Sequence, residues 1–357
     1  GGIEKVVMDL CKSQLKHAGI NPILLIGKKE GAFQSQLKAS GIPHTYAGFK
    51  SGKDVNLQLL KIIKSVFDNI DIIHIHTFNP IIAYAAIRSK RPILYTIHGN
   101  FGFGRKLNGF EKLNKYLLKV FLNKHVDHIT CNSKFTQITA VKHYRINTNN
   151  STIVFNGIPK DHIDQNESKG NETILDRIKN KYVVGTSSRF AGFKRIDRLI
   201  DAFSHVVKEI PNSILLLVGD GILKDELIKQ VDDLNLAEHV IFTGFQEKVS
   251  VYQQAMDVCV FPSENEPFGL VAIETLLLGK PTIVFEDGGG MKEILETSYP
   301  NDIVKDYEGL SNRIIHYYRN PISEKEQVNR TKFGSGFDID TMAQNIKNLY
   351  HKLLPGN

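Results

Sequence analysis

Short apolar runs alternate with longer stretches of helical period along most of the chain. Runs bounded by polar, Gly or Pro positions predict strands, and they fall into two series. The first series is 22–27, 71–76, 92–98, 127–131 and 151–155, and the second is 181–188, 213–219, 239–243, 257–261 and 281–285. Strands that alternate with helices in this way are typical of βαβ units and a parallel sheet. The pattern therefore predicts an α/β protein with two doubly wound sheets in tandem.

Two of the intervening stretches carry a clear apolar stripe. In 195–210, apolar residues recur at every third or fourth position, which predicts a helix packed on a sheet. The stretch 110–124 has apolar residues on one side and lysines elsewhere, so it predicts a basic amphipathic helix. Such a helix can lie on anionic lipid, although more commonly its apolar face packs on the core and its lysines are solvated. Both interpretations stay open at this stage.

The chain of 357 residues is long enough for two or three domains. The segment 160–180 is polar and has little apolar periodicity, which indicates a linker. We expect an N-terminal Rossmann-like domain over 1–160 and a C-terminal one over 175–336. The helix expected at 340–354 is a candidate to pack back on the first domain.

Composition and cysteine usage set the broad class. With 41% hydrophobic and 23% charged residues, the chain is neither disordered nor fibrous. Its three cysteines are far apart among apolar neighbours, which indicates buried thiols in a reducing compartment rather than disulfides or a metal cluster. No apolar stretch is long enough to span a membrane, and the N-terminus lacks a signal-peptide pattern. These features predict a cytoplasmic protein.

Charge is divided unevenly along the chain. Residues 1–160 hold 23 of the 45 Lys and Arg side chains and 8 of the 38 Asp and Glu side chains, a balance of +15. Residues 161–357 have a balance of −8, and the whole chain has +7. A basic half indicates an anionic partner such as nucleic acid, an acidic membrane surface or a phosphorylated ligand, or else a solvated lysine-rich surface.

The segment 262–274 runs from the end of an expected strand into an expected helix. Pro267 suits the first helical position, so we expect the helix to begin near 266–268. Free N–H groups there would face the carboxyl edge of the sheet, where the helix dipole favours an anion such as a diphosphate. The N–H groups concerned are those of Phe268, Gly269 and Leu270.

Four charged residues are expected beside this helix start. Glu266 lies at its mouth and Glu274 two turns further on, so both carboxylates can accept hydrogen bonds from sugar or ribose hydroxyls. Arg189 and Lys194 follow the strand 181–188, at the same edge of the sheet, where open α/β sheets bind ligands. Two cations aimed at an anion-binding helix start would clamp a diphosphate.

Further motifs recur in a defined order along the chain. They are GGIEKVV at 1–7, YTIHG at 95–99, FNGI at 155–158, SRFAGFK at 188–194, VGDG at 218–221, FTGF at 242–245, and the glutamates at 266 and 274. This order resembles the family-4 retaining glycosyltransferases over almost the whole chain. The resemblance implies the GT-B fold, with two facing Rossmann-like domains and a cleft between them. It is most specific at the glutamate pair.

The resemblance also implies an activity, with no metal and no cofactor. A sugar would pass with retention from a nucleoside diphosphate donor, with UDP- and GDP-sugars the leading candidates, to a glycan or lipid-linked acceptor in polysaccharide or glycolipid synthesis. Arg189 and Lys194 would hold the diphosphate, Glu274 the ribose and Glu266 the donor sugar. His98 would reach the reaction centre from the N-terminal domain, so His98 and Glu266 are the catalytic candidates.

Weaker candidates complete the implied donor site. They are Gly1, Gly2, Phe245 and Gly289. The sequence starts at the glycine loop, so the family's central first strand is expected to be absent from the N-terminal sheet. The resemblance leads us to expect non-aromatic residues between Arg189 and Lys194, where this chain has Phe190 and Phe193. We place both at the edge of the donor pocket.

Two patterns imitate metal sites. Asp338 and Asp340 spell an acid-x-acid motif, but they precede a helical pattern, so N-capping is the favoured role. His74 and His76 share one strand face without an evident third ligand, so a role at the sheet edge is favoured over zinc.

Two other functions remain as alternatives. One is a GT-B nucleotide-sugar epimerase, and the other is a non-catalytic GT-B scaffold that binds a nucleotide sugar. In all three cases no nucleic-acid partner is expected. The basic N-terminal domain would suit an anionic membrane surface at the cytoplasmic face, and it would also suit a soluble acceptor.

Overall fold

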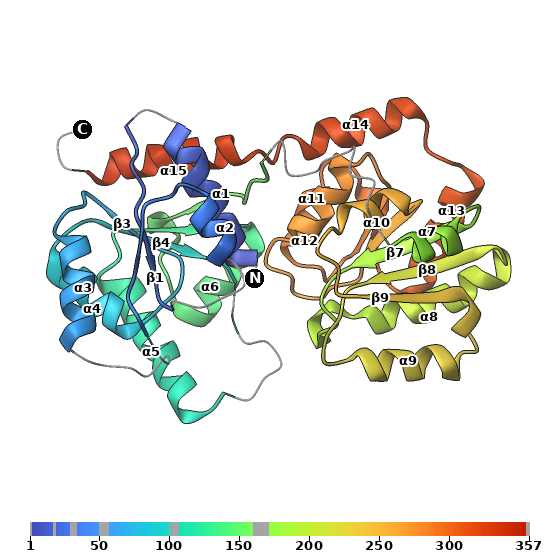
Figure 1. The fold of residues 1–357 in the computed structure, drawn as a ribbon, viewed down its shortest axis with the longest axis horizontal. Helices are drawn as coiled ribbons and strands as arrows, with labels where there is room; N and C mark the ends of the chain where they lie inside the picture. The colour runs from blue at the N-terminus through green and yellow to red at the C-terminus, as the bar shows by residue number, and fades with distance from the viewer. Residues whose placement is uncertain are drawn as a thin grey trace. The chain divides into compact units, whose positions relative to one another are not determined.

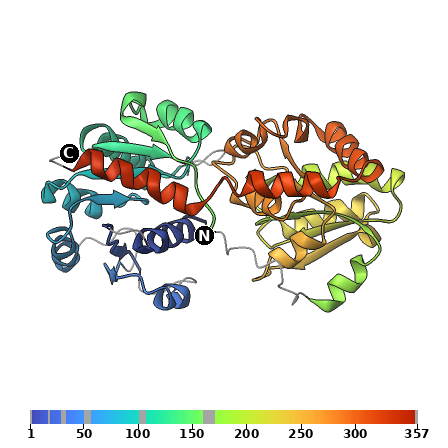
Figure 2. The same cartoon turned by 90° about the horizontal axis from the view of Figure 1, so that it is seen from above.

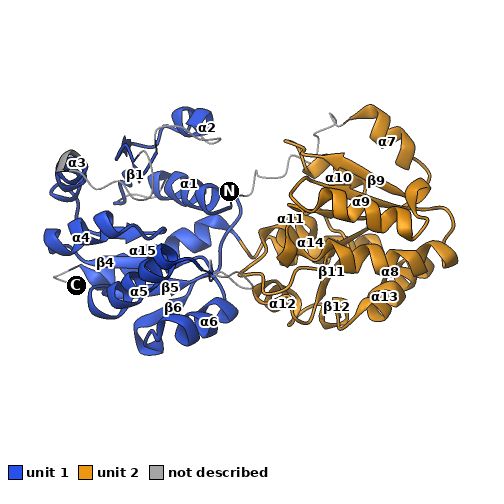
Figure 3. Cartoon of the chain, turned by 90° about the horizontal axis from the view of Figure 1, so that it is seen from below, with its two compact units in different colours: residues 1–159, 338–357 blue, residues 160–337 orange. Residues whose placement is uncertain are grey.

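The computed structural model describes residues 2–16, 19–28, 34–49, 57–99, 101, 107–159 and 171–354. The chain forms two compact units, which Figure 3 colours separately. Unit 1 comprises residues 1–159 and 338–357, and unit 2 comprises residues 160–337. Helices and strands alternate along the chain in both units (Figure 1).

Unit 1 contains two parallel sheets. The smaller pairs β1 (Leu24–Ile26) with β2 (His44–Tyr46). The larger has the order β3-β4-β5-β6, with β3 (Ile73–Ile75), β4 (Ile93–Ile97), β5 (His128–Cys131) and β6 (Ser151–Ile153). All its neighbours pair in parallel, so the carboxyl ends of the strands share one edge. The strands β1 and β3 do not pair with each other.

The helices of unit 1 cover these sheets. They are α1 (Gly2–Lys16), α2 (Gln34–Ala39), α3 (Leu57–Phe67), α4 (Pro80–Ser89), α5 (Gly109–Lys124), α6 (Lys134–Tyr144), the 3-10 turn η1 (Thr148–Asn150) and α15 (Ile339–Leu353). Ile63, Phe121 and Ile129 are fully buried in its core. The last helix, α15, packs against α1, although they lie at opposite ends of the sequence (Figure 2).

A glycine fixes the place where the chain returns to unit 1. A Cβ atom at Gly157 would lie 2.4 Å from the Cα atom of Ile339, so only glycine permits this approach. Ile158 and Asp338 form a parallel bridge beside it. The Asp338 side chain accepts a hydrogen bond from the Asp340 N–H and caps α15. The prediction that this acidic motif caps a helix is therefore confirmed.

Unit 2 contains one parallel sheet of six strands. The order is β12-β11-β10-β7-β8-β9, and the order reverses between β7 and β10, which pair with each other. The strands are β7 (Tyr182–Ser187), β8 (Ser213–Val218), β9 (Val240–Gly244), β10 (Val258–Phe261), β11 (Thr282–Phe285) and β12 (Ile303–Val304). This is a Rossmann-type arrangement, in which ligands bind outside the carboxyl ends of the strands at the reversal point.

Helices flank the sheet of unit 2. They are α7 (Glu172–Ile178), η2 (Gly192–Lys194), α8 (Ile196–Glu209), α9 (Lys224–Asp233), η3 (Ala237–His239), α10 (Ser250–Ala255), α11 (Leu270–Leu277), α12 (Gly290–Leu295), η4 (Pro300–Asp302), α13 (Tyr307–Arg319) and α14 (Glu324–Gly334). The apolar stripe of α8 is buried, as expected for a helix packed on a sheet. β8 and β10 are buried along their whole lengths.

The ten strands predicted from the sequence are all present, each within a few residues of its expected bounds. The strands β2 and β12 were missed because they are two or three residues long and lack an apolar run. The prediction of buried thiols is confirmed, since all three cysteines are buried and free. Among the described residues, no helix combines the length and apolarity needed to cross a membrane.

Candidate active site

The predicted donor-binding residues of unit 2 gather around the reversal point of its sheet. Arg189 and Lys194 follow β7, and Glu266 follows β10, the strand that pairs with β7. The α11 helix, which carries Glu274, begins beyond the same strand end. The topology thus places two cations, two carboxylates and a helix start at one sheet edge.

Two close backbone approaches shape the loop that carries Arg189. At Gly219, where φ is +139°, a Cβ atom would lie 2.0 Å from the carbonyl oxygen of Ser188, so glycine is required there. The N–H of Phe190 donates to the carbonyl of Asp220 at 2.9 Å. The side chain of Arg189 is exposed.

The aromatic residues of this loop differ in their surroundings. Phe190 is fully buried in the core of unit 2, where its ring meets that of Phe242 edge to face. The expectation that Phe190 lies at a pocket edge is therefore wrong, because its side chain packs into the hydrophobic core of unit 2. Phe193 is 37% exposed, and the Lys194 ammonium lies 5.1 Å from its ring centroid.

Lys194 and Glu266 form an ion pair. The Nζ atom of Lys194 donates to Oε2 of Glu266 at 2.7 Å, and both side chains are largely buried. A charge-assisted contact of this kind, shielded from solvent, is stronger than a surface ion pair. The sequence predicted both residues for the donor but not their contact. In this contact, each group satisfies the other's charge.

A second set of ion pairs joins the same loops, and the sequence analysis missed it. Arg195 contacts Glu264 at 3.1 Å, and Arg198 contacts Asp287 at 2.8 Å. Arg198 also lies 3.5 Å from Glu264. These contacts tie the start of α8 to the loops after β10 and β11. The spacing of the two arginines gave no such signal, because their partners lie far along the chain.

The α11 helix begins later than predicted. Its first residue is Leu270, and Gly269 is the N-cap with φ +94°. This left-handed conformation cannot belong to an α-helix, and the carbonyl of Glu266 accepts the Gly290 N–H at 2.7 Å instead of a helical donor. Phe268 therefore precedes the helix and is buried. The free N–H groups of the first turn begin at Leu270, and they can donate hydrogen bonds to an anion.

The remaining donor-site candidates lie on this edge or close to it. Glu274 is half-buried on the second turn of α11. Gly289 is the N-cap of α12, with φ +63°. Phe245 directly follows β9 and is 81% exposed. Their part in donor binding stays a prediction.

His98 lies at the carboxyl edge of the main sheet of unit 1. It directly follows β4, as His76 follows the neighbouring strand β3. The Nδ1 atom of His76 and the Nε2 atom of His98 are 3.0 Å apart, and the two rings stack with their centroids 5.3 Å apart. The ring of His74 lies 4.1 Å from that of His76. Three imidazoles therefore form a cluster at this edge.

A chain of hydrogen bonds holds His74 in place. Gln14 of α1 donates to the Tyr350 hydroxyl of α15 at 3.4 Å, and that hydroxyl lies 2.7 Å from Nδ1 of His74. On the other side, Nε2 of His74 lies 2.6 Å from Oγ1 of Thr96, which contacts the Thr130 hydroxyl. A consistent assignment has Tyr350 donating to His74, and His74 to Thr96. Both nitrogens of His74 are then used, which leaves none for a metal.

Burial keeps the three histidines neutral. It lowers the pKa of His98 to about 4, although the nearby Glu4 carboxylate opposes this effect. Burial, with the charge of His98 second, lowers the pKa of His74 to about 3. The pKa of His76 falls well below its ordinary value for the same reason. At neutral pH, His98 can therefore donate or accept one hydrogen bond through each nitrogen without carrying charge.

The structure describes one of the two glycines predicted at the start of the chain. Gly2 is the first residue of α1, is exposed, and has open space where a Cβ would lie. Gly1 lies outside the described residues, and so does the first part of the expected linker, 160–170.

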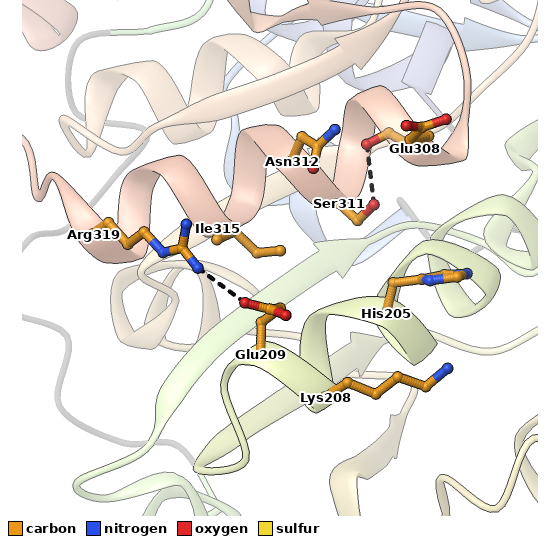
Figure 4. A pocket seen from close by; sticks show the side chains of 8 residues that line it. All are labelled: His205, Lys208, Glu209, Glu308, Ser311, Asn312, Ile315 and Arg319. Carbon is orange, nitrogen blue, oxygen red and sulfur yellow. Dashed lines mark hydrogen bonds and ion pairs between the residues drawn. The ribbon is translucent and has the colours of Figure 1, made fainter.

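A separate pocket of unit 2 lies between α8 and α13 (Figure 4). The ion pair of Glu209 and Arg319, at 2.9 Å, crosses it. Glu209 ends α8, about 20 Å along the helix from Arg195 at its start. The pocket is therefore remote from the reversal point and brings together none of the predicted residues.

The chain is thus an α/β protein with two Rossmann-like units, each with polar groups at the carboxyl edge of its sheet. Two family models then match the chain: "Glycosyltransferase Family 4" over residues 1–162 and "Glycosyl transferases group 1" over residues 170–333. The chain belongs to these glycosyltransferases. The family predicted from the sequence motifs and the predicted glycosyltransferase activity are thereby confirmed.

Individual relatives agree with this family. The chain is 24% identical over 345 residues to the UDP-Gal:alpha-D-GlcNAc-diphosphoundecaprenol alpha-1,3-galactosyltransferase of Escherichia coli, covering 92% of this chain and 88% of that one. It is 24% identical over 319 residues to the alpha-monoglucosyldiacylglycerol synthase of Acholeplasma laidlawii, covering 81% and 77%. A crystal structure of HepE from Anabaena in complex with UDP has a TM-score of 0.78 at 24% identity, covering 99% and 96%. The fold is thus GT-B, as predicted, and a transferase fits better than an epimerase or a scaffold.

Proposed function

We propose that this glycosyltransferase takes a sugar from a nucleoside diphosphate donor bound at the reversal point of unit 2. The Lys194–Glu266 ion pair carries the proposal, because it unites the predicted diphosphate ligand and the predicted sugar ligand at one sheet edge. Arg189 and the first turn of α11 add positive potential there. UDP-sugars are the favoured donors, since HepE, which shares the fold, binds UDP.

The donor would rearrange this ion pair. Its diphosphate would take up the Lys194 ammonium, and the Glu266 carboxylate would then accept hydrogen bonds from sugar hydroxyls. Lys194 and Arg189 would offset the charge that grows on the leaving phosphate. These cations supply the charge that a metal ion supplies elsewhere, so we propose that the transfer needs no metal.

We propose that the transfer retains the configuration at the anomeric carbon. The bond from that carbon to the diphosphate oxygen breaks, and the electron pair leaves with the phosphate. The acceptor oxygen bonds to the carbon on the same face, and its proton passes to the leaving phosphate. Glu266, which would accept hydrogen bonds from the sugar hydroxyls, is assigned no nucleophilic role. Neutral His98 would hold the donor or acceptor from unit 1 by a hydrogen bond.

The acceptor is proposed to be a lipid-linked sugar or a glycolipid at the cytoplasmic face of a membrane. The relative from E. coli is named for a diphosphoundecaprenol-linked sugar, and the relative from A. laidlawii for the synthesis of a monoglucosyldiacylglycerol. The balance of +15 over residues 1–160 suits an acceptor that carries a diphosphate or lies in an anionic membrane.

The test is transfer from a panel of UDP- and GDP-sugars to polyprenyl-diphosphate-sugar and diacylglycerol acceptors. We expect one donor to be used, an anomeric proton coupling in the product that matches the donor, and the same rate with EDTA. Inverted product or loss of activity with EDTA would refute retention or metal independence, respectively. An epimer formed from donor alone would support the epimerase instead.

A further inference from the structure

Arg195 joins the 3-10 turn η2 to the α8 helix in a left-handed backbone conformation. Its φ is +49° and its ψ is +42°, and it directly follows Lys194. A residue with a Cβ atom disfavours this conformation, which persists only where surrounding contacts hold it. The contacts of the Arg195 side chain therefore help to fix the turn that carries Lys194.

Two carboxylates hold the Arg195 guanidinium. Its Nε and Nη2 atoms donate to Oδ1 and Oδ2 of Asp197 at 3.1 and 2.8 Å, which is the forked geometry that arginine favours. Its Nη1 atom donates to Oε2 of Glu264, in the loop after β10, at 3.1 Å. The turn before α8 is thus tied both to the first turn of α8 and to a loop that follows the neighbouring strand.

Glu264 is shared with a second arginine. The Nη2 atom of Arg198, on the first turn of α8, lies 3.5 Å from the same Oε2 atom, and Arg198 also pairs with Asp287 of the loop after β11 at 2.8 Å. Opposite charges therefore alternate along five residues, which we name the outer network: Asp197, Arg195, Glu264, Arg198 and Asp287. Single exposed ion pairs contribute little, but several charges in a network contribute more.

The outer network runs beside the Lys194–Glu266 ion pair. Lys194 directly precedes Arg195, and Glu266 lies two residues after Glu264. The side chains of Lys194 and Glu266 are 11% and 14% exposed, whereas those of Arg195 and Glu264 are 29% and 36% exposed. The Glu264 N–H also donates to the Phe193 carbonyl at 2.8 Å. Two ion pairs therefore bridge the same two loops, one largely buried and the other partly exposed.

The two ion pairs would respond differently to a bound donor. In the proposed function, the diphosphate takes up the Lys194 ammonium, so the pair with Glu266 no longer joins the loops. The outer network contains none of the predicted donor-binding residues, so its contacts would stay in place. It can therefore keep Lys194 close to Glu266 both before and after the donor binds.

We infer that Arg195 and Glu264 are positioning residues for donor binding, which hold Lys194 where its ammonium meets the diphosphate. The inference rests on the proposed function, because it takes the diphosphate as the ligand of Lys194. Neither Arg195 nor Glu264 is assigned a contact with the donor. The outer network adds little stability, because the left-handed turn costs part of what these partly exposed ion pairs gain.

Calorimetric titration of the full chain with UDP and GDP measures this role. Both probes carry the diphosphate and lack the sugar that Glu266 would bind. Glu264→Gln removes the charge but keeps the shape of the side chain, and it should raise the Kd of the nucleotide that binds about fivefold. Arg195→Gly still permits the left-handed turn but removes the guanidinium, so it should raise the Kd about tenfold. The number of sites per chain should stay the same, since loss of folded protein would lower that number instead.

A double variant tests whether Glu264 acts through Lys194. In a Lys194→Ala chain, Glu264→Gln should change the Kd by less than about twofold, because residues that act through one group do not add their effects. Glu209→Gln is the matched control. Glu209 also pairs with an arginine, Arg319, but at the other end of α8, so this variant should bind nucleotide as the wild type does.

Two results would overturn the inference and leave the donor site standing. One is a wild-type Kd in both Glu264→Gln and Arg195→Gly. The other is an equal loss from Glu264→Gln in the Lys194→Ala chain and in the wild type, because Glu264 would then act by another route. A folded wild-type chain that binds neither nucleotide would refute the proposed donor site, and this inference with it.

Discussion

The two units place polar groups at the edge of a parallel sheet in different ways. In unit 2, Lys194 and Glu266 lie in the loops of two adjacent strands and contact each other directly. In unit 1, His98 is held through His76, and the neighbouring His74 depends on Tyr350, which the end of the chain supplies. The comparison teaches that the unit 2 site is local to its sheet, whereas the unit 1 site needs a distant helix.

The surroundings of the two sites differ as well. Unit 2 anchors its helices with a buried charged network, in which Asp302 accepts from Arg330, Arg313 and Tyr317. Unit 1 instead joins half-buried neutral imidazoles to buried threonine hydroxyls. The stability of unit 2 should therefore fall most when a charge is removed, and the stability of unit 1 should fall most when a charge is introduced.

The largest expected effect is on the stability of unit 2. Arg330 is 3% exposed and contacts Asp302 at 3.0 Å, so Arg330→Met leaves a buried carboxylate short of one partner. Breaking a buried pair in this way costs about 3–5 kcal/mol of unfolding free energy. Urea unfolding measures it. In the control Arg319→Met, the lost pair with Glu209 is exposed and costs less than about 1 kcal/mol. Equal losses would contradict the buried network.

The second effect concerns catalysis in unit 1. We expect His98→Ala to lower kcat by about 10²–10³-fold, the usual cost of removing one hydrogen bond that stabilises the transition state. Nucleoside diphosphate affinity should stay the same, because the predicted donor residues lie in unit 2. Steady-state kinetics and calorimetry measure the two quantities. A parallel loss of both would place the histidine in the donor site.

The contact between His76 and His98 sharpens this prediction. Asn carries a nitrogen near the position of the His76 Nδ1 atom, so His76→Asn should keep most of the turnover that His76→Ala loses. Neither variant should change nucleotide affinity. If Asn and Ala lower kcat equally, the hydrogen bond does not position His98.

The third effect is a dependence of stability on pH. The lowered pKa values of His74 (about 3) and His98 (about 4) mean that the unfolded chain binds more protons than the folded one below about pH 6.5. The free energy of unfolding is therefore highest above pH 6.5. It falls as the pH falls, by about 1.4 kcal/mol per pH unit for each histidine. Unfolding at pH 7 and 5 measures the slope, and His74→Gln should reduce it. The same slope in the variant would contradict neutral burial.

The smallest effect compares two helix caps. Asp338 caps α15 in unit 1, and Asp306 caps α13 in unit 2. Replacing either with Ala should cost about 1 kcal/mol. Only Asp338→Ala should also lower turnover, because α15 carries Tyr350. Unfolding and kinetics on both variants test this, and equal turnover would show that the histidine cluster does not depend on α15.

The sequence predicted the sheets well because their strands are apolar runs between polar boundaries. It also placed Lys194 and Glu266 at one edge, since parallel strands share their carboxyl ends. It predicted the start of α11 too early, because Gly269 takes the left-handed conformation between Pro267 and the first helical residue, Leu270. A proline favours the first turn of a helix. It does not indicate that the preceding carbonyl, that of Glu266, accepts a hydrogen bond from Gly290 in a neighbouring loop.

The rest of the candidate site depends on contacts between distant segments. The Tyr350–His74 bond joins residues 276 positions apart, and no local pattern encodes it. Arg195 and Glu264 are likewise 69 positions apart. The exposure of Leu113, Tyr116 and Leu117 on α5 was also beyond the sequence, since the periodicity of an amphipathic helix is the same whether its apolar side packs on a core or faces solvent.

The most direct test of the donor site is calorimetric titration of the purified chain with UDP, GDP and ADP. We predict that one nucleotide binds, and that Lys194→Ala weakens it by about 1.5–3 kcal/mol, as for a hydrogen bond to a charged group. Val328→Gln, a change at an exposed position of α14 in unit 2, should bind it as the wild type does. Binding that Lys194→Ala leaves unchanged, or no binding to folded chain, would contradict a donor site at the reversal point of unit 2.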